Sequence, residues 1–338
     1  MTTELTTLLE KPVQGTNGLQ FSYNTKLRPF EKAGEAALDF SVEKRDLFTS
    51  DGIRLKRHFA VGRVGSPDIN YDVCGKVWEA IQPEEVKEVA RLIATLTNGT
   101  IERSYALNAG QRFGAVIALP GHLVLGSKDV NVKCITIGCG NDGSALIGMS
   151  HMMRLFCSNQ YYSLIDSNRK HAKKAQVVLR IRHTKNGAER VRMATKIAQQ
   201  LSAAFLSSEE MAYKLSNRPI DAKNGELAAY YDKVLPYPAK PDSFKDEKEK
   251  ETFEQTMERL RAIRGSMRDT FVRECEQLQT GPSLWLAMNS VTKWAQHDMR
   301  IKGKDDPENR AWSADQPDGN GFKMTIAAQI AALKMCQV

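Results

Sequence analysis

The alternation of apolar and polar residues in the segment VVLRIRHT predicts a strand with two different faces. Leu179, Ile181 and His183 alternate with Arg180 and Arg182. A period of two places the first set against a core and the guanidinium groups on the opposite face. At His183, a hydrogen-bonded core histidine is favoured over a phosphate contact.

Similar alternation predicts further strands upstream. The segment IRLKRHFAVGRV, residues 53–64, interleaves cations with apolar residues, and shorter strands are expected at 104–107, 114–119 and 130–138. The last of these runs into Asn141-Asp142-Gly143, which has the composition of a tight turn. The sequence therefore predicts a β-hairpin at this point.

Apolar residues at helical spacing predict several helices. One opens with Pro-Glu-Glu and covers 83–96, since proline and acids favour a first turn. Another covers 189–205, and a long, charged, amphipathic helix covers 244–278. Two more are expected around 284–297 and 322–335.

Together these elements predict an α+β protein, with a largely antiparallel β-sheet packed on helices and a helical C-terminal third. The expected organisation is an irregular N-terminal arm over 1–45 and an α+β core over 46–216. A Pro-containing loop or linker follows over 217–246, and a helical region covers 247–338.

The motifs of several enzyme classes are absent from this sequence. Gly138-Cys139-Gly140-Asn141-Asp142-Gly143 fits G-x-G-x-x-G, but a dinucleotide site needs a helix there, whereas Asn-Asp-Gly favours a hairpin. No phosphate-binding loop G-x-x-x-x-G-K-[ST] and no G-x-S-x-G nucleophile motif occur. We therefore predict no catalytic residue and no nucleotide cofactor.

Metal chemistry is not indicated either. Asp129, Asp142 and Asp166 fall near predicted strand ends, where turn or capping roles are favoured over a metal pair. The six cysteines are scattered without C-x-x-C spacing, which indicates buried reduced thiols rather than zinc or disulfides. No metal site is predicted.

No run of about 18 apolar residues appears, which argues against a membrane span. The N-terminal segment MTTELTTLLEKPVQG carries acid where a secretory signal is basic, and its apolar stretch is short. A cytoplasmic protein is expected.

The positive charge of the chain is concentrated in one module. The formal net charge is +8, yet residues 151–200 alone hold eleven Lys and Arg against two acids. Because a solvated surface usually mixes signs, this excess favours an anionic partner over an ordinary basic surface.

Nucleic acid is the anion that these residues fit best. The candidate phosphate contacts are Arg154, Arg169, Lys170, Lys173, Lys174, Arg180, Arg182, Lys185, Arg190, Arg192 and Lys196, with Arg54, Lys56 and Arg57 as a facing wall. Tyr161 and Tyr162 precede the cluster and are candidates for base stacking, although paired tyrosines also occur in cores and interfaces.

The chain resembles a widespread family of phage- and plasmid-borne proteins of unassigned function. The resemblance rests on YDVCGKVWEAIQPEE, GQRFGAVIALPG, GNDGSALIG, MRLFCSNQ, RIRHTKN and WLAMNSVTKWAQH, in that order. It is specific in RIRHT and WLAMNSVT. The sequence departs from the family pattern at Gln296, where aspartate is usual, and at Asn141, where histidine is usual.

That family is similar in general design to phage single-strand annealing proteins of the RecT, Redβ and ERF types. The resemblance implies ATP-independent binding and annealing of single-stranded DNA in phage or plasmid recombination, by a ring or helical homo-oligomer. An exonuclease or a host single-strand-binding protein is a candidate partner. The alternatives are a metal-dependent nuclease and a mobile-element interaction protein that inhibits a host factor.

Overall fold

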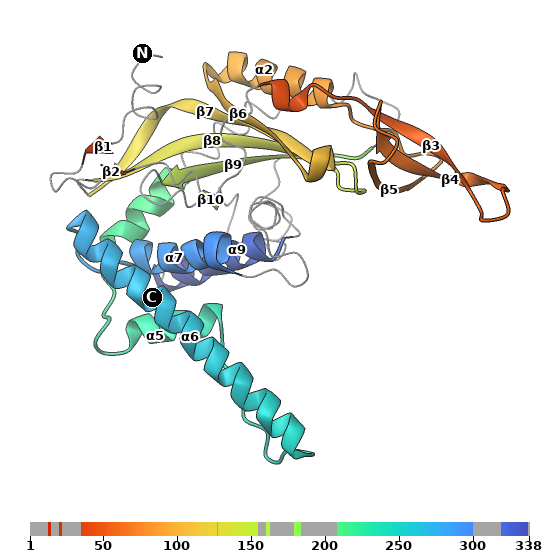
Figure 1. Ribbon diagram of the computed structural model, residues 1–338. Helices are drawn as coiled ribbons and strands as arrows, with labels where there is room; N and C mark the ends of the chain where they lie inside the picture. Colours follow the sequence, from red (N-terminus) through yellow and green to blue (C-terminus); the bar gives the residue numbers. More distant parts are fainter. Residues whose placement is uncertain are drawn as a thin grey trace. The chain divides into compact units, whose positions relative to one another are not determined.

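The protein has the predicted α+β fold and forms two compact units (Figure 1). Unit 1 takes its described residues from 1–123, 131–153 and 162–208, and unit 2 from 124–130, 154–161 and 209–338. The computed structural model describes residues 13–14, 20–21, 35–126, 128–154, 160–162, 179–183, 208–299 and 319–336.

Unit 1 is built around a sheet with the strand order β10-β9-β8-β7-β6, and β11 also pairs with β9. The strands are β6 (Thr100–Leu107), β7 (Arg112–Leu125), β8 (Asp129–Gly140), β9 (Leu146–Arg154), β10 (Gln160–Tyr162) and β11 (Leu179–Ile181). The outer ends of β7, β8 and β9 belong to unit 2, as do Gln160 and Tyr161 of β10. A short turn joins β8 to β9, so the predicted hairpin is confirmed and the G-x-G-x-x-G segment opens no helix.

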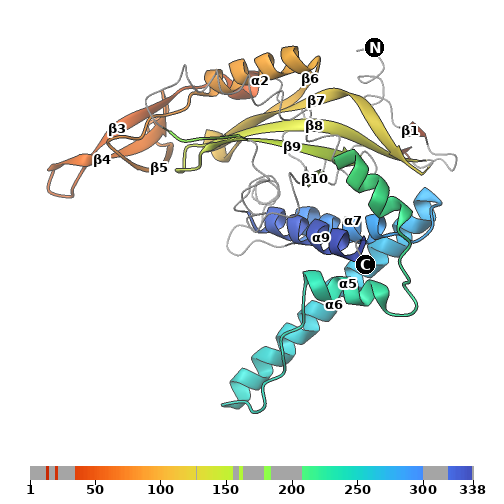
Figure 2. The same ribbon diagram turned by 180° about the vertical axis from the view of Figure 1, so that it is seen from behind.

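One helix covers a face of this sheet (Figures 1 and 2). It is α2 (Pro83–Thr97), which matches the predicted helix, and it buries Val86, Val89 and Ile93. Its first turn is closed because the Glu85 carboxylate accepts from the Gln82 backbone N–H at 2.7 Å.

A second, three-stranded sheet in unit 1 consists of β3 (Val42–Phe48), β4 (Arg54–Arg63) and β5 (Asn70–Gly75), all antiparallel. Val42, Val61, Tyr71 and Cys74 form its core. The β3–β4 hairpin projects from the end of the larger sheet within the unit (Figures 1 and 2).

The described elements before β3 are β1 (Val13–Gln14), β2 (Gln20–Phe21) and the 3-10 turn η2 (Glu35–Leu38). β1 pairs with β2, and β3 begins inside the segment that the sequence predicted as an irregular arm. Short strands with mixed charge carry too little alternation to be recognised in a sequence.

Unit 2 is helical. Its elements are helical residues 209–217, α5 (Glu226–Val234), α6 (Glu247–Leu278), α7 (Leu284–Lys293), the π-helical turn η4 (Trp294–Asp298) and α9 (Asn320–Cys336). Every residue of α7 from Leu284 to Thr292 is buried. None of the described helices is both long and apolar enough to span a membrane.

The helix α5 corrects the prediction of a loop over 217–246. Leu227, Tyr230, Tyr231 and Val234 are buried at helical spacing, and the Tyr230 hydroxyl donates to the Ala328 carbonyl at 3.0 Å. The helix is only nine residues long and prolines flank it, which obscures its periodicity in the sequence.

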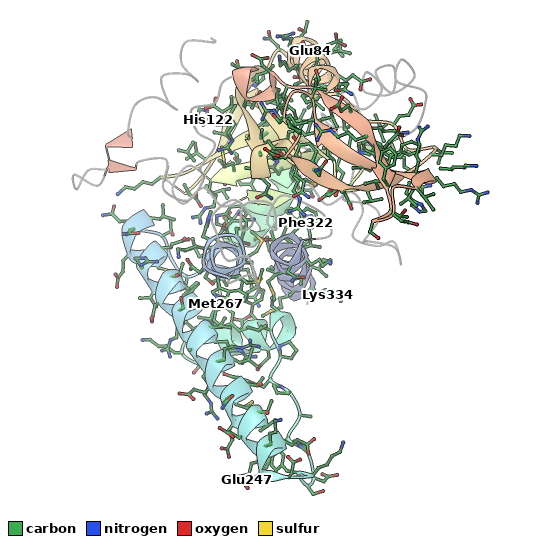
Figure 3. The ribbon with its side chains drawn as sticks, turned by 45° about the vertical axis from the view of Figure 1, so that its right-hand side comes forward. Glu84, His122, Glu247, Met267, Phe322 and Lys334 are labelled. Carbon is green, nitrogen blue, oxygen red and sulfur yellow. The ribbon has the colours of Figure 1, made fainter. Side chains whose placement is uncertain are left out.

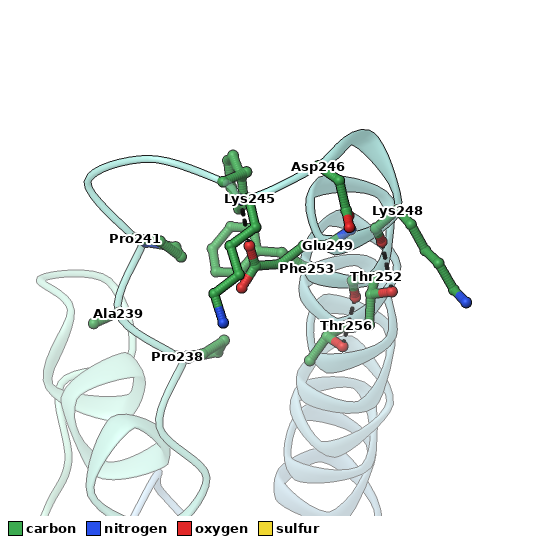
Figure 4. Close-up of a pocket in the computed structure, with 11 residues that line it drawn as sticks. Pro238, Ala239, Pro241, Lys245, Asp246, Lys248, Glu249, Thr252, Phe253 and Thr256 are labelled. Carbon is green, nitrogen blue, oxygen red and sulfur yellow. Dashed lines mark hydrogen bonds between the residues drawn. The ribbon is translucent and has the colours of Figure 1, made fainter.

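The long helix α6 confirms the predicted amphipathic helix. Its N-cap Asp246 accepts from the Glu249 N–H at 2.7 Å. Figure 3 shows the helix running from Glu247 at its outer end to Met267, which is buried among the other helices. Beside its first turns lies a segment of chain whose Phe244 ring stands 5.6 Å from that of Phe253 (Figure 4).

Candidate nucleic-acid interface

The β3–β4 hairpin carries the three residues that the sequence assigns to a facing wall. Arg54, Lys56 and Arg57 lie at the start of β4 and are all exposed. The turn before them is closed by a hydrogen bond from the Thr49 N–H to the Ile53 carbonyl at 2.9 Å. Gly52 in this turn has a φ of +83°, which favours glycine.

This part of the hairpin stands free of any core. Lys56, Arg57 and His58 are exposed in succession, although neighbouring strand residues point to opposite faces. Further along the same strand, Ala60 and Val61 are buried. The register between β3 and β4 is irregular here, so the end of the hairpin presents Arg54, Lys56 and Arg57 to solvent without a regular two-faced pattern.

The cations of the hairpin differ in their pairing. Arg54 contacts the Asp46 carboxylate at 2.7 Å, and both side chains are exposed. Exposed pairs of this kind contribute about 0–1 kcal/mol. Within the described part of the chain, Lys56 and Arg57 form no ion pair, so their charges are available to an external anion.

The segment RIRHT behaves as its alternation predicts wherever its side chains are described. Ile181 is buried and Arg182 is exposed. The strand β11 pairs antiparallel with β9, and Ile181 lies opposite Leu146. Arg182 therefore lies beside the sheet with its guanidinium group directed to solvent.

His183 holds this segment in place. Its Nδ1 lies 3.0 Å from the Glu79 carbonyl oxygen and 3.3 Å from the Ile81 N–H, and its Nε2 lies 2.7 Å from the Ser144 carbonyl oxygen. The ring also stacks on Trp78, with centroids 4.8 Å apart. The core interpretation of His183 is confirmed, and it is the anchor that fixes Arg182.

The opposite roles of Ile181 and Arg182 are testable. Replacing Ile181 with Val should lower the free energy of unfolding by about 0.5–1.5 kcal/mol, because a buried methylene is lost. Replacing Arg182 with Ala should change it by no more than about 0.5 kcal/mol and weaken oligonucleotide binding severalfold at 0.1 M salt. Thermal melts and fluorescence anisotropy check both variants. Early melting of the Arg182 variant with unchanged binding would mean that Arg182 is a structural residue.

Arg154 corrects the sequence-based assignment. It is fully buried in unit 2, so it is not a phosphate contact in this structure. Its Nε donates to Asp129 at 2.9 Å and its Nη1 to Glu274 at 2.8 Å. The Trp285 indole N–H also donates to Asp129 at 2.7 Å. The positive charge of Arg154 is needed to hold two buried carboxylates.

Burial raises the pKa of Glu274, and the neighbouring Arg154 guanidinium opposes that rise. Elsewhere, in unit 1, burial raises the pKa of Asp142, but hydrogen bonds from Ser144 and Arg112 outweigh it and leave the pKa lowered. Two of the three aspartates considered for a metal pair, Asp129 and Asp142, lie among the described residues. Each forms an ion pair with an arginine: Asp129 with Arg154, and Asp142 with Arg112. No metal-binding group of His, Cys, Asp or Glu occurs among the described residues.

Much of the predicted basic cluster lies outside the described residues. These residues are Arg169, Lys170, Lys173, Lys174, Lys185, Arg190, Arg192 and Lys196. The backbone of Arg180 belongs to β11 and that of Tyr161 and Tyr162 to β10, but their side chains also fall outside the description.

Sequence reasoning missed two residues at the closed end of the hairpin. Phe48 and Ile53 are 58% and 62% exposed. Both are apolar residues to which the sequence pattern gives no role. The signal that distinguishes them is the turn-forming Ser50-Asp51-Gly52 directly between them, which places both at a hairpin tip.

The chain belongs to the family of the domain of unknown function DUF932, which is matched over residues 70–315 and therefore over more than half of the chain. The match includes the RIRHT segment, His183 and the buried Arg154 cluster. It begins at Asn70, the first residue of β5, after the β3–β4 hairpin. No curated protein and no solved structure matches the chain.

Proposed function

We propose that this protein binds and anneals single-stranded DNA without ATP in phage or plasmid recombination, in the cytoplasm. The observation that carries the proposal is the free-standing basic hairpin. Lys56 and Arg57 are exposed on β4 without ion-pair partners among the described residues, which suits contact with a flexible polyanion.

The chemistry of such a grip is independent of sequence. Lys and Arg attract phosphates wherever they occur along a strand, and they leave base edges free to pair. Annealing requires this division, because the protein must hold the backbone while the complementary bases meet. The sequence's charge excess over 151–200 supplies further cations of the same kind.

Annealing also requires two strands to be held near each other, which favours several copies of the chain. We propose a ring or helical homo-oligomer, in which a repeated head-to-tail interface aligns the basic hairpins. The outer half of α6 is a candidate contact, since its residues from Glu247 to Arg259 are exposed or only half-buried. An exonuclease would supply the single strand, and a host single-strand-binding protein would compete for it.

Binding of oligonucleotides of unrelated sequence at several salt concentrations tests the proposal. We expect similar affinities for these oligonucleotides and a steep fall with salt, with a log–log slope of roughly −0.7 for each neutralised phosphate. Mixing complementary strands should then give faster duplex formation with the protein and without ATP. A flat salt response would contradict the proposal.

The same mixtures separate the alternatives. Loss of plasmid integrity with Mg²⁺ or Mn²⁺ would instead favour a nuclease. Absence of oligonucleotide binding at low salt, in a sample that melts cooperatively, would favour an interaction protein whose target is another protein.

A further inference from the structure

The tip of the β3–β4 hairpin exposes two large apolar side chains. Phe48 and Ile53 stand at the last positions before the turn closes, and Phe48 lies opposite Arg54 in the strand register. Leaving such side chains in water is unfavourable relative to burial. Scattered exposed apolar residues are ordinary, but here two of them flank a single turn.

The charges around the tip are unevenly distributed. On the strand side, Arg54, Lys56 and Arg57 follow directly after Ile53. Asp46 pairs with Arg54. At the apex, the Thr49 hydroxyl donates to the Asp51 carboxylate, and this hydrogen bond lowers the pKa of Asp51 and keeps it ionised.

We propose that Phe48 forms a base-contacting tip, in which a nucleobase stacks on the exposed Phe48 ring beside its cross-strand neighbour Arg54. Lys56 and Arg57 hold the phosphates on the strand side. This inference rests on the proposed function and assigns the hairpin a second role, since its cations grip the backbone and its tip contacts the bases.

The spacing of the hairpin supports this division. Cross-strand neighbours such as Phe48 and Arg54 have Cα atoms about 5 Å apart. The exposed cations Arg54, Lys56 and Arg57 follow within a few residues of the same strand. An aromatic ring and two cations therefore lie within the reach of one or two nucleotides.

The Asp51 carboxylate at the apex of the turn favours a single strand of nucleic acid over a lipid surface as the partner of the tip. Insertion of the tip into a bilayer would carry the Asp51 carboxylate deepest, where a charge is costly. A single strand approaching from the side avoids the apex, because the base meets the Phe48 ring while its phosphates remain near Lys56 and Arg57. The carboxylate thus directs the phosphates toward the strand side.

Comparison of a normal and an abasic oligonucleotide tests the tip. We propose to measure the Kd of a dT oligonucleotide and of an abasic strand of equal length for wild type, Phe48→Ala and Val73→Ala. Val73 is a matched control, because it is 55% exposed and pairs with Ala60, about 23 Å along the strand from Ile53.

We expect wild type and Val73→Ala to bind the dT strand about tenfold more tightly than the abasic strand, because stacking on an aromatic ring favours the intact base. Phe48→Ala should bind both strands equally, with the salt slope and the melting temperature of wild type. A Phe48→Trp variant should keep the preference and show indole fluorescence quenched by dT. An unchanged preference in Phe48→Ala, or an unquenched Trp, would overturn the proposal.

Two further outcomes are distinct from these. A wild-type protein that binds neither strand at any salt concentration would contradict the proposed function itself. Binding of wild type to vesicles of phosphatidylglycerol and phosphatidylcholine that Phe48→Ala abolishes, with no dT preference in either protein, would overturn the base-contacting tip in favour of a lipid contact.

Discussion

Replacing Arg154 with Ala is expected to lower the free energy of unfolding by about 3–5 kcal/mol. The guanidinium group is buried between Asp129 and Glu274, each only 2% exposed at its side chain. Its removal leaves two carboxylates close together without water or a positive charge. Chemical denaturation followed by circular dichroism measures the loss.

Two comparisons show whether the loss comes from uncompensated charge. Arg182→Ala removes the same charge from an exposed position and should melt close to wild type. Combining Arg154→Met with Asp129→Asn and Glu274→Gln removes the whole ion cluster and should recover much of the stability, since neutral groups of similar volume tolerate burial. If Arg154→Ala melts as wild type and loses oligonucleotide affinity, Arg154 belongs after all to the phosphate contacts.

The Arg154 cluster illustrates a limit of sequence reasoning. Its partners lie 25 residues before it and 120 residues after it, on β8 and α6. No local pattern marks an arginine as buried, because the strand end and the long helix must first fold together. Composition alone therefore groups Arg154 with the basic cluster, whereas the fold buries it between two carboxylates.

Local patterns predicted the elements that carry their own signals. Pro83 with Glu84 and Glu85 marks the start of α2, and Asn141-Asp142-Gly143 marks the β8–β9 turn. The alternation that ends in Ile181, Arg182 and His183 gave the correct faces, because period two is set by the strand itself.

Elements that depend on tertiary packing were harder to predict. The short α5 becomes stable through contacts such as the hydrogen bond from Tyr230 to Ala328, almost a hundred residues away. The exposure of Phe48 and Ile53 depends on the hairpin projecting beyond its core. Their hydrophobicity alone indicates burial, so only the geometry of the turn shows them as surface residues.

Removing the three cations of the hairpin is expected to have the largest effect on DNA binding. A variant carrying Arg54→Ala, Lys56→Ala and Arg57→Ala should reduce the log–log salt slope by about 2 and weaken affinity about 100-fold at 0.1 M salt, because each lost phosphate contact contributes roughly 0.7 to the slope. The effect should be the same for unrelated oligonucleotide sequences. Fluorescence anisotropy across a salt series measures both quantities.

A variant of equal charge separates a local grip from general attraction. Lys233 on α5 and Arg261 and Arg268 on α6 are exposed outside the candidate oligomer contact, and their replacement by Ala lowers the net charge of the chain by the same three units. Attraction by the overall charge would weaken binding equally in both variants, whereas phosphate contact at the hairpin weakens it only in the first. Both variants should melt near wild type, since exposed residues of this kind shift stability by about 0.5 kcal/mol each. Equal affinities for the two triple variants would remove the hairpin from the binding surface, and the residues over 151–200 would then have to bind the strand without it.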